Sequence, residues 1–392
     1  MIEGVVRIYF DHNATTPLHP AVLEGMTQAL AEDFGNASSV HAFGQKAKAQ
    51  LDLARARVAT LIGAEPNDLV WTSGGTEADN FAVRGVAEAL ESRGRTHLVA
   101  SAVEHEAVLN TCKHLSRRGW TLSLVAPDGA GRISPEALRE VVTPQTALVS
   151  VMHANNEIGT LQPIVELAAV AHDAGAVFHT DAVQTVGKTR VDVGDLGVDL
   201  LALSGHKFGG PKGTGALWIR RGTRIAPLLT GGRHERNRRA GTENVPALVG
   251  LGIAALEARA HCDEHQRHVE KLRDRLEAGI LSRIPYTVVN GDSTHRVYNT
   301  TNISFERVEA ESLLIALDLE GIAVSTGSAC SSGTLEPSHV LKAMRLTPAR
   351  TQSALRFSLG PDNTDAEVDR ALQVLPVLVE KLRSLTRMPA AR

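Results

Sequence analysis

Two hydrophobic periodicities alternate along the first two thirds of the chain. Short apolar runs bounded by turn residues predict buried strands, and longer stretches with apolar residues at helical spacing predict helices. The expected elements are strands at 68–73, 97–101, 121–126, 147–152, 176–182 and 199–204, and helices at 45–61 and 165–174. This alternation predicts an α/β fold with a large, mainly parallel sheet that helices cover on both faces.

A smaller α/β unit is predicted after a long helix that runs from Pro246 to about Ile284. Its expected elements are two strands and a helix, at 300–305, 354–360 and 310–321. The pattern therefore predicts a large domain of residues 15–258 and a small domain formed by 1–14 and 259–392. Because no flexible linker separates them, a ligand cleft is expected where they meet.

The composition is that of a globular protein, with 43% hydrophobic residues in a chain of 392, which is enough for a large core. The net charge of −3 provides no long-range attraction to nucleic acid or to anionic membranes. No apolar run approaches the roughly 20 residues of a membrane span, and the N-terminus lacks a signal-peptide pattern. With only three cysteines, we expect working thiols, a cytoplasmic location, and neither a membrane nor direct nucleic-acid binding.

Lys207 comes shortly after a predicted strand, within the glycine-rich segment SGHKFGGPKGTGALWI (204–219). Open α/β sheets bind ligands at the carboxyl ends of their strands, so this position favours a role in a site. Ser204 and His206 add a hydroxyl and an imidazole beside the lysine. The segment lacks the glycine, lysine and serine or threonine triplet of a P-loop at the required spacing, which argues against nucleotide binding.

Two further strand ends carry candidate polar groups. Asp181 ends the strand in HTDAVQT (179–185), where a buried carboxylate needs a cation such as a protonated pyridine nitrogen. A simple helix cap is the alternative for this aspartate. In TSGGTE (72–77), Gly75 and Thr76 open a predicted helix whose N-terminus suits a phosphate. Neither motif is specific by itself.

Ordered motifs extend along nearly the whole chain. They are DHNATTP (11–17), NASSVHAFGQKAKAQLDLAR (36–55), TSGGTEADN (72–80), EHEAVLN (104–110), MHANNEIGTLQPI (152–164), HTDAVQ (179–184), SGHKFGGPKGTGALW (204–218), RRAGTENVPALVG (238–250), STGSACSSG (325–333), LEPSHVLKAM (335–344) and LRFSLG (355–360). Together they resemble the class V aminotransferase fold family, and within it the group I cysteine desulfurases. The resemblance implies the fold type I architecture of pyridoxal-phosphate-dependent transferases, pyridoxal 5'-phosphate as cofactor of the large domain, and a homodimer with shared active sites.

The resemblance also implies roles for individual residues. Lys207 corresponds to the lysine that holds the cofactor as a Schiff base and moves the substrate α-proton, and His105 to the imidazole that stacks on the cofactor ring and exchanges protons. The other residues implied in cofactor binding are Asp181 at the ring nitrogen, Gln184 at the phenolic oxygen, Gly75, Thr76, Ser204 and His206 at the phosphate, and Thr242 at the phosphate of the neighbouring subunit. Those implied in substrate binding are Asn155, Arg356 and Asn13.

Cys330 lies in STGSACSSG (325–333), a run of small residues with two glycines. The run resembles the loop of group I desulfurases, whose cysteine takes sulfur from L-cysteine as a persulfide while L-alanine leaves. The persulfide then passes to an acceptor protein for iron–sulfur cluster assembly or thiolation. The segment RRAGTEN (238–244) is closer to the nitrogen-fixation-type branch. An exposed thiol without a role is the alternative when Cys330 is considered alone.

Two other functions remain open: a selenocysteine lyase or another β-eliminating enzyme of the same fold, and a non-enzymatic sulfur-relay scaffold. Cys112 falls on an apolar helix face and is predicted to pack in the core. The run HCDEHQRH (261–268) has metal-like spacing but no second ligand cluster, so no metal is expected. The basic run RHERNRR (233–239) is predicted to line the dimer rather than to bind RNA.

Overall fold

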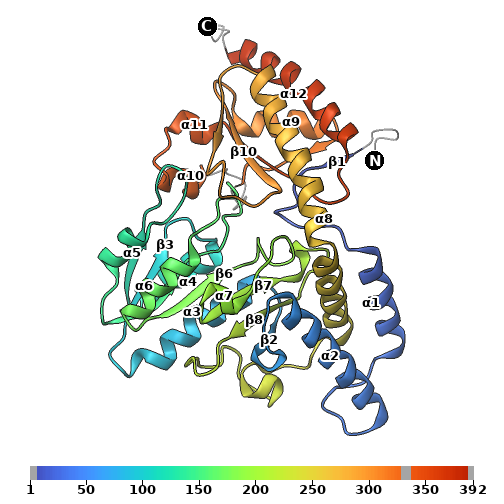
Figure 1. Cartoon of the computed structure of the whole chain (residues 1–392), viewed down its shortest axis with the longest axis vertical. Coiled ribbons are helices and arrows are strands. Elements are labelled where there is room, and N and C mark those ends of the chain that lie inside the picture. Colours follow the sequence, from blue (N-terminus) through green and yellow to red (C-terminus); the bar gives the residue numbers. More distant parts are fainter. Residues whose placement is uncertain (1–6, 328–336, 387–392) are drawn as a thin grey trace.

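The computed structural model describes residues 7–327 and 337–386 and shows a two-domain α/β architecture (Figure 1). The large domain is built on a seven-stranded sheet with the strand order β2-β8-β7-β6-β5-β3-β4. The strands are β2 Leu69–Thr72, β3 His97–Ser101, β4 Thr121–Val125, β5 Thr146–Ser150, β6 Val177–Asp181, β7 Leu200–Ser204 and β8 Gly215–Ile219. Strand β8 pairs antiparallel with both neighbours and the other pairs are parallel, so the predicted mainly parallel sheet is confirmed.

Helices cover both faces of this sheet. In chain order they are α1 Pro20–Glu32, α2 Ala42–Leu61, α3 Gly75–Glu91, α4 Glu106–Ser116, α5 Pro135–Val141, α6 Ile164–Asp173 and α7 Val193–Leu196. Successive side chains of a strand point to opposite faces. In β7, Leu200 therefore enters one hydrophobic core, with α3 and α4, while Leu201 enters the other, with α2 and α6. This explains why the strands read as short uninterrupted apolar runs.

The small domain contains a three-stranded antiparallel sheet in the order β12-β10-β9. Its strands are β9 Thr287–Asn290, β10 Thr300–Phe305 and β12 Ala354–Ser358, and its helices are α9 Ala310–Leu319, α10 His339–Ala343, α11 Pro348–Gln352 and α12 Asp365–Thr386. The N-terminal strand β1, Ile8–Tyr9, joins this domain by pairing in parallel with β11, Ile322–Ala323. Phe10, Phe305 and Phe357 are fully buried in its core. The chain therefore returns to the small domain after building the large one.

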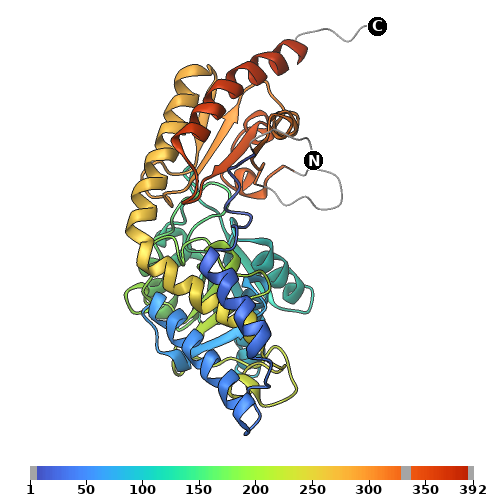
Figure 2. The ribbon, with the colours of Figure 1, turned by 90° about the vertical axis from the view of Figure 1, so that its right-hand side faces the viewer.

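Helix α8, Val245–Arg283, runs along both domains and confirms the predicted long helix (Figures 1 and 2). Its first half contributes Leu248 and Leu251 to the large core, and its second half contributes Leu272 and Leu276 to the small core. The predicted domain boundary at 258–259 lies within this continuous helix. Among the described residues, α8 alone is long and apolar enough to span a membrane, yet 56% of its apolar window is buried, as in a core helix.

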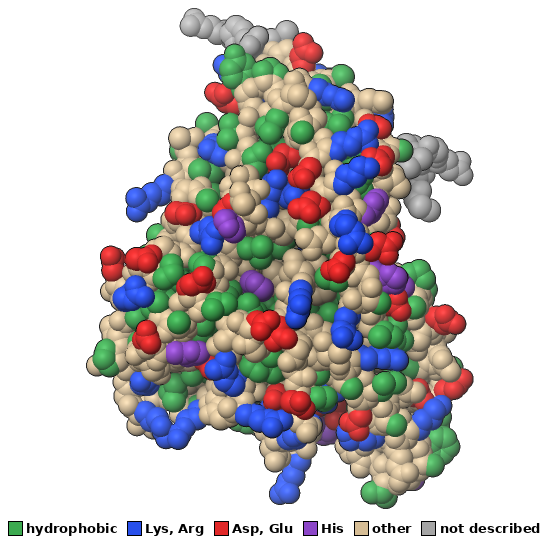
Figure 3. Space-filling view, in the orientation of Figure 1, with side chains coloured by type: hydrophobic (Ala, Val, Ile, Leu, Met, Phe, Trp, Pro, Cys, Tyr) green, Lys and Arg blue, Asp and Glu red, His purple; other side chains and the backbone are tan. Residues whose placement is uncertain are grey.

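Acidic and basic side chains are interspersed over the face shown in Figure 3. No large patch of one sign dominates this face, which agrees with the near-neutral net charge of −3. This face therefore presents no surface of a single charge sign that would mark a binding site.

Candidate active site

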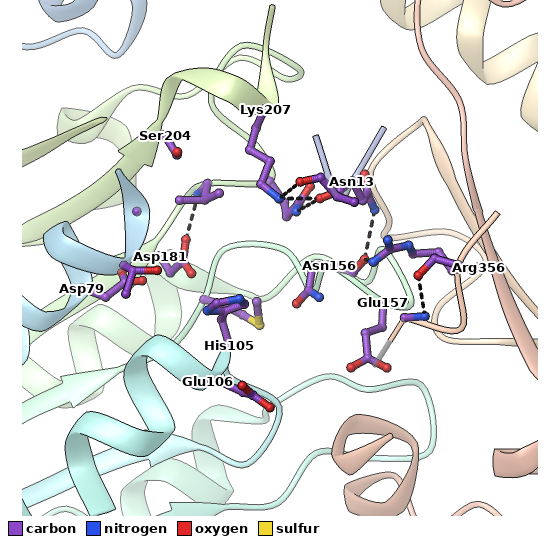
Figure 4. Close-up of a pocket in the computed structure, with 18 of the residues that line it drawn as sticks. Asn13, Asp79, His105, Glu106, Asn156, Glu157, Asp181, Ser204, Lys207 and Arg356 are labelled. Atoms are coloured by element: carbon purple, nitrogen blue, oxygen red, sulfur yellow. Dashed lines mark hydrogen bonds between the residues drawn. The ribbon is translucent and has the colours of Figure 1, made fainter. Parts of the chain in front are cut away.

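A cavity of about 440 Å³ lies between the two domains and receives side chains from both (Figure 4). The residues expected in the site that line it are Asn13, Gly75, Thr76, His105, Asp181, Gln184, Ser204, His206, Lys207 and Arg356. Most of them follow the carboxyl ends of β2, β3, β6 and β7, which meet at one edge of the sheet. The predicted cleft at the domain junction is confirmed.

Lys207 lies in a single turn of 3₁₀ helix, Gly205–Lys207, that continues from the end of β7. Its Nζ donates hydrogen bonds to the main-chain oxygens of Asn13, at 2.5 Å, and Ala14, at 2.9 Å. Burial and the nearby Arg356 lower the pKa of Lys207 to about 8, against the opposing effect of Asp181. The amine is thus held in the cavity with a proton that it can release near neutral pH.

Asp181 is the last residue of β6, and its carboxyl group faces the cavity while only 5% of the residue is exposed. The main-chain N–H of Val183 donates to Oδ1 at 2.9 Å. No ion pair joins Asp181 to a cationic side chain in the described parts of the chain. Burial raises the pKa of Asp181, and His105 and Lys207 partly oppose this effect. A cation supplied by a ligand would complete this environment.

Two further carboxyl groups are buried beside Asp181, and sequence reasoning did not single them out. Asp79 of α3 lines the cavity next to Asp181, and its Oδ1 lies 3.5 Å from Nε2 of His179 (Figure 4). Glu104 accepts hydrogen bonds from the Ser101 hydroxyl and from the Met152 N–H. Burial raises the pKa of Glu104 to about 8, and burial together with the charge of Asp181 raises the pKa of Asp79. This side of the site thus gathers three buried carboxyl groups, none of which pairs with a lysine or arginine of the described chain.

His105 caps the N-terminus of α4 and lies across the cavity from Lys207 in the view of Figure 4. The N–H of Ala107 donates to His105 Nδ1 at 3.1 Å, so Nδ1 is an acceptor and carries no proton. The proton of the neutral ring is therefore on Nε2. This single capping contact sets both the tautomer and the direction of the imidazole.

The N-terminus of α3 offers free main-chain donors at the cavity wall. Its N-cap, Gly74, has φ 151° and provides no side-chain hydrogen bond to the helix. A Cβ atom at Gly75 would lie 2.7 Å from Cγ2 of Val183, so only glycine permits this close approach. Ser204 and His206 lie on the same side of the cavity as these donors. An uncapped helix N-terminus with hydroxyl and imidazole groups nearby is a favourable phosphate site.

Arg356 of β12 projects into the cavity from the small domain and is only 4% exposed. Its guanidinium pairs with Asp11 at 2.6 Å and donates to the Asn156 main-chain oxygen at 3.0 Å. Its Nε has no hydrogen-bond partner among the described residues. Asn13 donates to the same Asn156 oxygen at 3.1 Å. The small-domain side therefore presents a buried cation that suits a carboxylate.

Comparison with known proteins agrees with this geometry. Residues 8–371 match the family "Aminotransferase class-V". The chain is 50% identical over 382 residues to the cysteine desulfurase of Gluconacetobacter diazotrophicus, covering 97% of this chain and 95% of the relative. It is 49% identical over 379 residues to the cysteine desulfurase IscS of Methanosarcina thermophila, covering 97% and 93%. The chain belongs to the cysteine desulfurases of the class-V aminotransferase family.

Solved structures of this family share the fold. A NifS-like protein superimposes with a TM-score of 0.88 and 36% identity, covering 97% of this chain and 99% of that chain. A structure described as SspA in complex with cysteine superimposes with a TM-score of 0.80 and 34% identity, covering 92% and 100%. Enzymes of this family depend on pyridoxal phosphate. The family and fold inferred from the motifs are therefore confirmed.

Three expected site residues do not lie on the described cavity wall. Asn155 is fully buried and directed away: its Nδ2 donates to the Val103 oxygen, and its Oδ1 accepts from the N–H groups of Glu157 and Ile158. Its carboxamide is used to hold the turn, which corrects the expected contact with substrate. The neighbouring Asn156 lines the cavity instead.

The other two are Thr242 and Cys330. Thr242 is exposed and is not among the residues that line the cavity, so its expected contact with a neighbouring subunit stays a prediction. Cys330 lies outside the described residues. The described residues before and after its segment, Ser325 and Gly327 on one side and 337–339 on the other, all line the cavity.

The remaining sequence expectations concern the rest of the chain. Cys112 is 1% exposed in the core beside α3 and α4, as predicted. Within the basic run 233–239, the carboxylate of Glu235 forms a buried ion pair with Arg55 at 2.5 Å. The run 261–268 lies on α8, and the described residues contain no group of three or more potential metal ligands. None of these residues lines the cavity between the domains, and the dimer contact expected for 233–239 stays a prediction.

Proposed function

We propose that this protein is a cysteine desulfurase that converts L-cysteine to L-alanine and receives the sulfur on Cys330 as a persulfide. One observation carries the proposal. In a chain 50% identical to a cysteine desulfurase, the amine of Lys207 meets in one cavity the carboxyl group of Asp181, which forms no ion pair with the described residues. Sulfur transfer from cysteine needs both groups, one to hold a carbonyl cofactor and one to keep its ring protonated.

The cavity fits pyridoxal 5'-phosphate on its own geometry. The uncapped α3 N-terminus at Gly75 and Thr76 would hold the phosphate, with Ser204 and His206 beside it. Asp181 lacks a cationic partner in the described chain, which leaves its carboxyl group for a ring nitrogen. Gln184 would donate to the phenolic oxygen, and His105 would lie against the ring.

When bound, the cofactor supplies an electron sink that stabilises negative charge on the substrate α-carbon. The protein provides the other functions. Lys207, whose pKa is lowered to about 8, removes the α-proton and returns a proton. Arg356 binds the substrate carboxylate through its guanidinium, and His105 exchanges a proton with the sulfur group from the ring nitrogen that faces away from Ala107.

The sulfur step balances without an external oxidant. The thiolate of Cys330 attacks the sulfur of L-cysteine, a new sulfur–sulfur bond forms, and the carbon–sulfur bond of the substrate breaks. The electron pair of the broken bond remains on the carbon skeleton, which takes up protons and leaves as L-alanine. The persulfide on Cys330 then passes to an acceptor protein that serves iron–sulfur cluster assembly or thiolation. The segment that contains Cys330 begins and ends at cavity-lining residues, which supports this assignment.

The assembly and location are also proposals. We propose a homodimer in which Thr242 reaches the cofactor phosphate of the partner, supported by the exposure of Thr242 in the single chain. A cytoplasmic location is supported by the need for a reduced thiol at Cys330. L-cysteine as substrate is supported by the similarity of this fold to that of SspA, which was solved in complex with cysteine.

The test compares the purified wild type with Lys207→Ala and Cys330→Ala in the presence of L-cysteine and a reductant. Sulfide, alanine and the absorption spectrum of bound cofactor are measured. Lys207→Ala is expected to lose the covalent cofactor and all turnover, whereas Cys330→Ala keeps the cofactor spectrum and loses sulfur transfer. Cys262→Ala, a thiol on α8 outside the cavity, is the matched control and should retain activity.

The alternatives predict different results. Full alanine formation by Cys330→Ala would identify a β-eliminating enzyme such as a selenocysteine lyase. Absence of any cofactor spectrum in the wild type after incubation with pyridoxal phosphate would favour a sulfur-relay scaffold instead.

A further inference from the structure

Lys188 lies in the loop after β6 and is a buried cation that the proposed reaction does not use. The residue is only 6% exposed. Its Nζ donates to Oδ1 of Asn13 at 2.9 Å and to Oε1 of Gln184 at 2.8 Å. Within the described residues it forms no ion pair. A buried lysine with two neutral acceptors is uncommon, and both acceptors belong to residues that line the active-site cavity.

The orientation of both carboxamides follows from the surrounding hydrogen bonds. Nε2 of Gln184 faces the main-chain oxygen of Asn13 at 3.0 Å, and Nδ2 of Asn13 faces the main-chain oxygen of Asn156 at 3.1 Å. A carbonyl oxygen only accepts, so both nitrogens must donate, and both amide oxygens must point to Lys188. Oδ1 of Asn13 also accepts from Nδ2 of Asn299 at 3.1 Å, whereas Oε1 of Gln184 has no second donor among the described residues, so Gln184 is the residue that needs a donor at 188.

Gln184 has one N–H beyond the one that it donates to Asn13. Because its oxygen is held by Lys188, this second N–H is left for a ligand in the cavity that Gln184 lines. Without a donor at 188, Oε1 of Gln184 would lose the donor that faces it, and the hydrogen bond from Nε2 to the Asn13 oxygen alone would hold the carboxamide less firmly against rotation that presents its oxygen. An oxygen beside the phenolic oxygen of the cofactor would repel it rather than bind it.

The loop geometry explains why Lys188 can serve both residues. Gln184 and Lys188 are four residues apart, and the turn between them places both side chains toward the segment that contains Asn13. That segment also accepts two hydrogen bonds from Lys207 through the oxygens of Asn13 and Ala14. Lys188 thus supports one small network that joins the cofactor lysine, the ring-oxygen donor and the substrate wall.

We propose that Lys188 is a positioning residue for the cofactor: by donating to Gln184 and Asn13 it aims the amide N–H of Gln184 at the cofactor's phenolic oxygen. The inference rests on the proposed function, because it assumes that pyridoxal phosphate occupies this cavity. Lys188 itself does not touch the reacting atoms. Its contribution should therefore pass through Gln184.

Several titratable groups interact with Lys188 electrostatically or share its surroundings. They are Lys207 and Arg356 in the active site, His12 and His206 in the adjoining segments, and Glu257 and His265 of α8, which line a neighbouring cavity together with Lys188. Burial and the charges of Lys207 and Arg356 lower the pKa of Lys188. The donor role holds in either protonation state, since a neutral amine still has two N–H groups for its two acceptors.

A double-mutant cycle distinguishes this role from general packing. Lys188→Met removes the donors but keeps the length of the side chain, and Gln184→Ala removes the residue through which Lys188 should act. Each protein is saturated with pyridoxal phosphate, and the pH midpoint of the absorption change of the lysine-bound cofactor is measured together with cofactor affinity. Lys271→Met, at an exposed position of α8, is the matched control.

Lys188→Met is expected to raise the pH midpoint by about one unit and to weaken cofactor affinity about tenfold. The reason is the loss of the proposed charge-assisted hydrogen bond from Gln184 to the phenolic oxygen of the cofactor. Gln184→Ala should do the same, and the double variant should change little further. If Lys188→Met is not obtained folded, Lys188→Leu replaces it, because a leucine side chain also carries no hydrogen-bond donor.

Additive effects in the cycle, or a midpoint in Lys188→Met equal to that of Lys271→Met, would overturn the inference. A lower melting temperature with an unchanged midpoint would also overturn it, because packing alone would then account for the burial of Lys188. If the wild type itself binds no pyridoxal phosphate, the proposed function fails instead, so the two failures are distinguishable.

Discussion

The two walls of the active-site cavity are built in opposite ways. On the large-domain wall, Asp79 and Asp181 are buried, with Glu104 buried beside them, and none of the three carboxyl groups has a cationic partner among the described residues. The histidine near Asp79, His179, is neutral. On the small-domain wall, the buried cation Arg356 already has a carboxylate partner, Asp11, at 2.6 Å. The large-domain wall therefore contains no carboxylate–cation ion pair among the described residues, although Lys207 lies on it, whereas the small-domain wall contains one.

This difference indicates how each wall binds its ligand. A protonated cofactor ring would bring an ion-pair partner to Asp181 on the large-domain wall, so its binding relieves the cost of burying this carboxyl group. A substrate carboxylate at the small-domain wall must share Arg356 with Asp11. We therefore expect tight, lasting binding of the cofactor and weaker, exchangeable binding of the substrate, as a catalytic cycle needs.

The largest effect should come from removing the charge that faces the cofactor ring. Asp181→Asn keeps the shape but cannot hold a protonated ring nitrogen, so kcat should fall about 1000-fold, equivalent to about 4 kcal/mol. Cofactor affinity should fall with it. Steady-state alanine formation and cofactor titration measure both. Asp173→Asn, exposed at the end of α6, is the control, and an Asp181→Asn enzyme within tenfold of wild type would contradict the comparison.

Glu104→Gln should stabilise the fold in a pH-dependent way. The folded-state pKa of Glu104 is raised to about 8, so the folded state holds a proton that the unfolded state releases near its ordinary value of 4.5. The wild type therefore loses stability as pH rises from about 5 to 8, by about 3 kcal/mol, and the variant does not. Thermal unfolding at several pH values measures the difference.

The exposed Glu88→Gln variant on α3 is the matched control for this measurement. A gap between Glu104→Gln and wild type that stays constant from pH 5 to 8 would show that Glu104 is ionised throughout. The large-domain side of the site would then carry one more negative charge than it does with Glu104 protonated.

On the small-domain wall, Arg356→Lys should mainly weaken substrate binding. Lysine keeps the charge but loses the planar fork that bridges a carboxylate and the Asn156 oxygen. We expect KM for L-cysteine to rise about 30-fold, equivalent to about 2 kcal/mol, with a smaller change in kcat and an unchanged cofactor spectrum. An unchanged KM, or loss of the cofactor spectrum, would place Arg356 in a different role.

The smallest effect is expected at Asp79. Burial and the charge of Asp181 raise the pKa of Asp79, which favours the neutral carboxyl group that an amide resembles closely. Asp79→Asn should therefore keep kcat and cofactor affinity within about threefold of wild type. A loss as large as that of Asp181→Asn would mean that both carboxyl groups are charged, and the two would then act as a pair.

Sequence reasoning predicted most of the named elements well because each is a local pattern. The strand at 300–305 and the long helix after Pro246 match β10 and α8 almost residue for residue. Strand β8 was not predicted, since its residues follow a glycine-rich segment that reads as a loop. Its pairing between β2 and β7 depends on distant partners.

The residues of the site also divide into those marked by a local pattern and those that depend on distant partners. Lys207, Asp181 and the α3 N-terminus were predictable because each directly follows a strand end, a position visible in the chain. Lys188 and Glu104 were missed because an isolated lysine or glutamate has no local mark of burial. Asn155 was assigned to the substrate although its neighbour Asn156 faces the cavity, because a sequence does not show which of two adjacent amides turns outward.

The sequence by itself determined the family, the order of elements and the candidate for the cofactor lysine, since these depend on motifs and on short-range periodicity. Only the tertiary structure decided the charge balance of the two walls and the orientation of the amides of Gln184 and Asn13. Burial and hydrogen bonding between segments such as 11–13, 184–188 and 356 depend on distances in space, which separation along the chain does not encode.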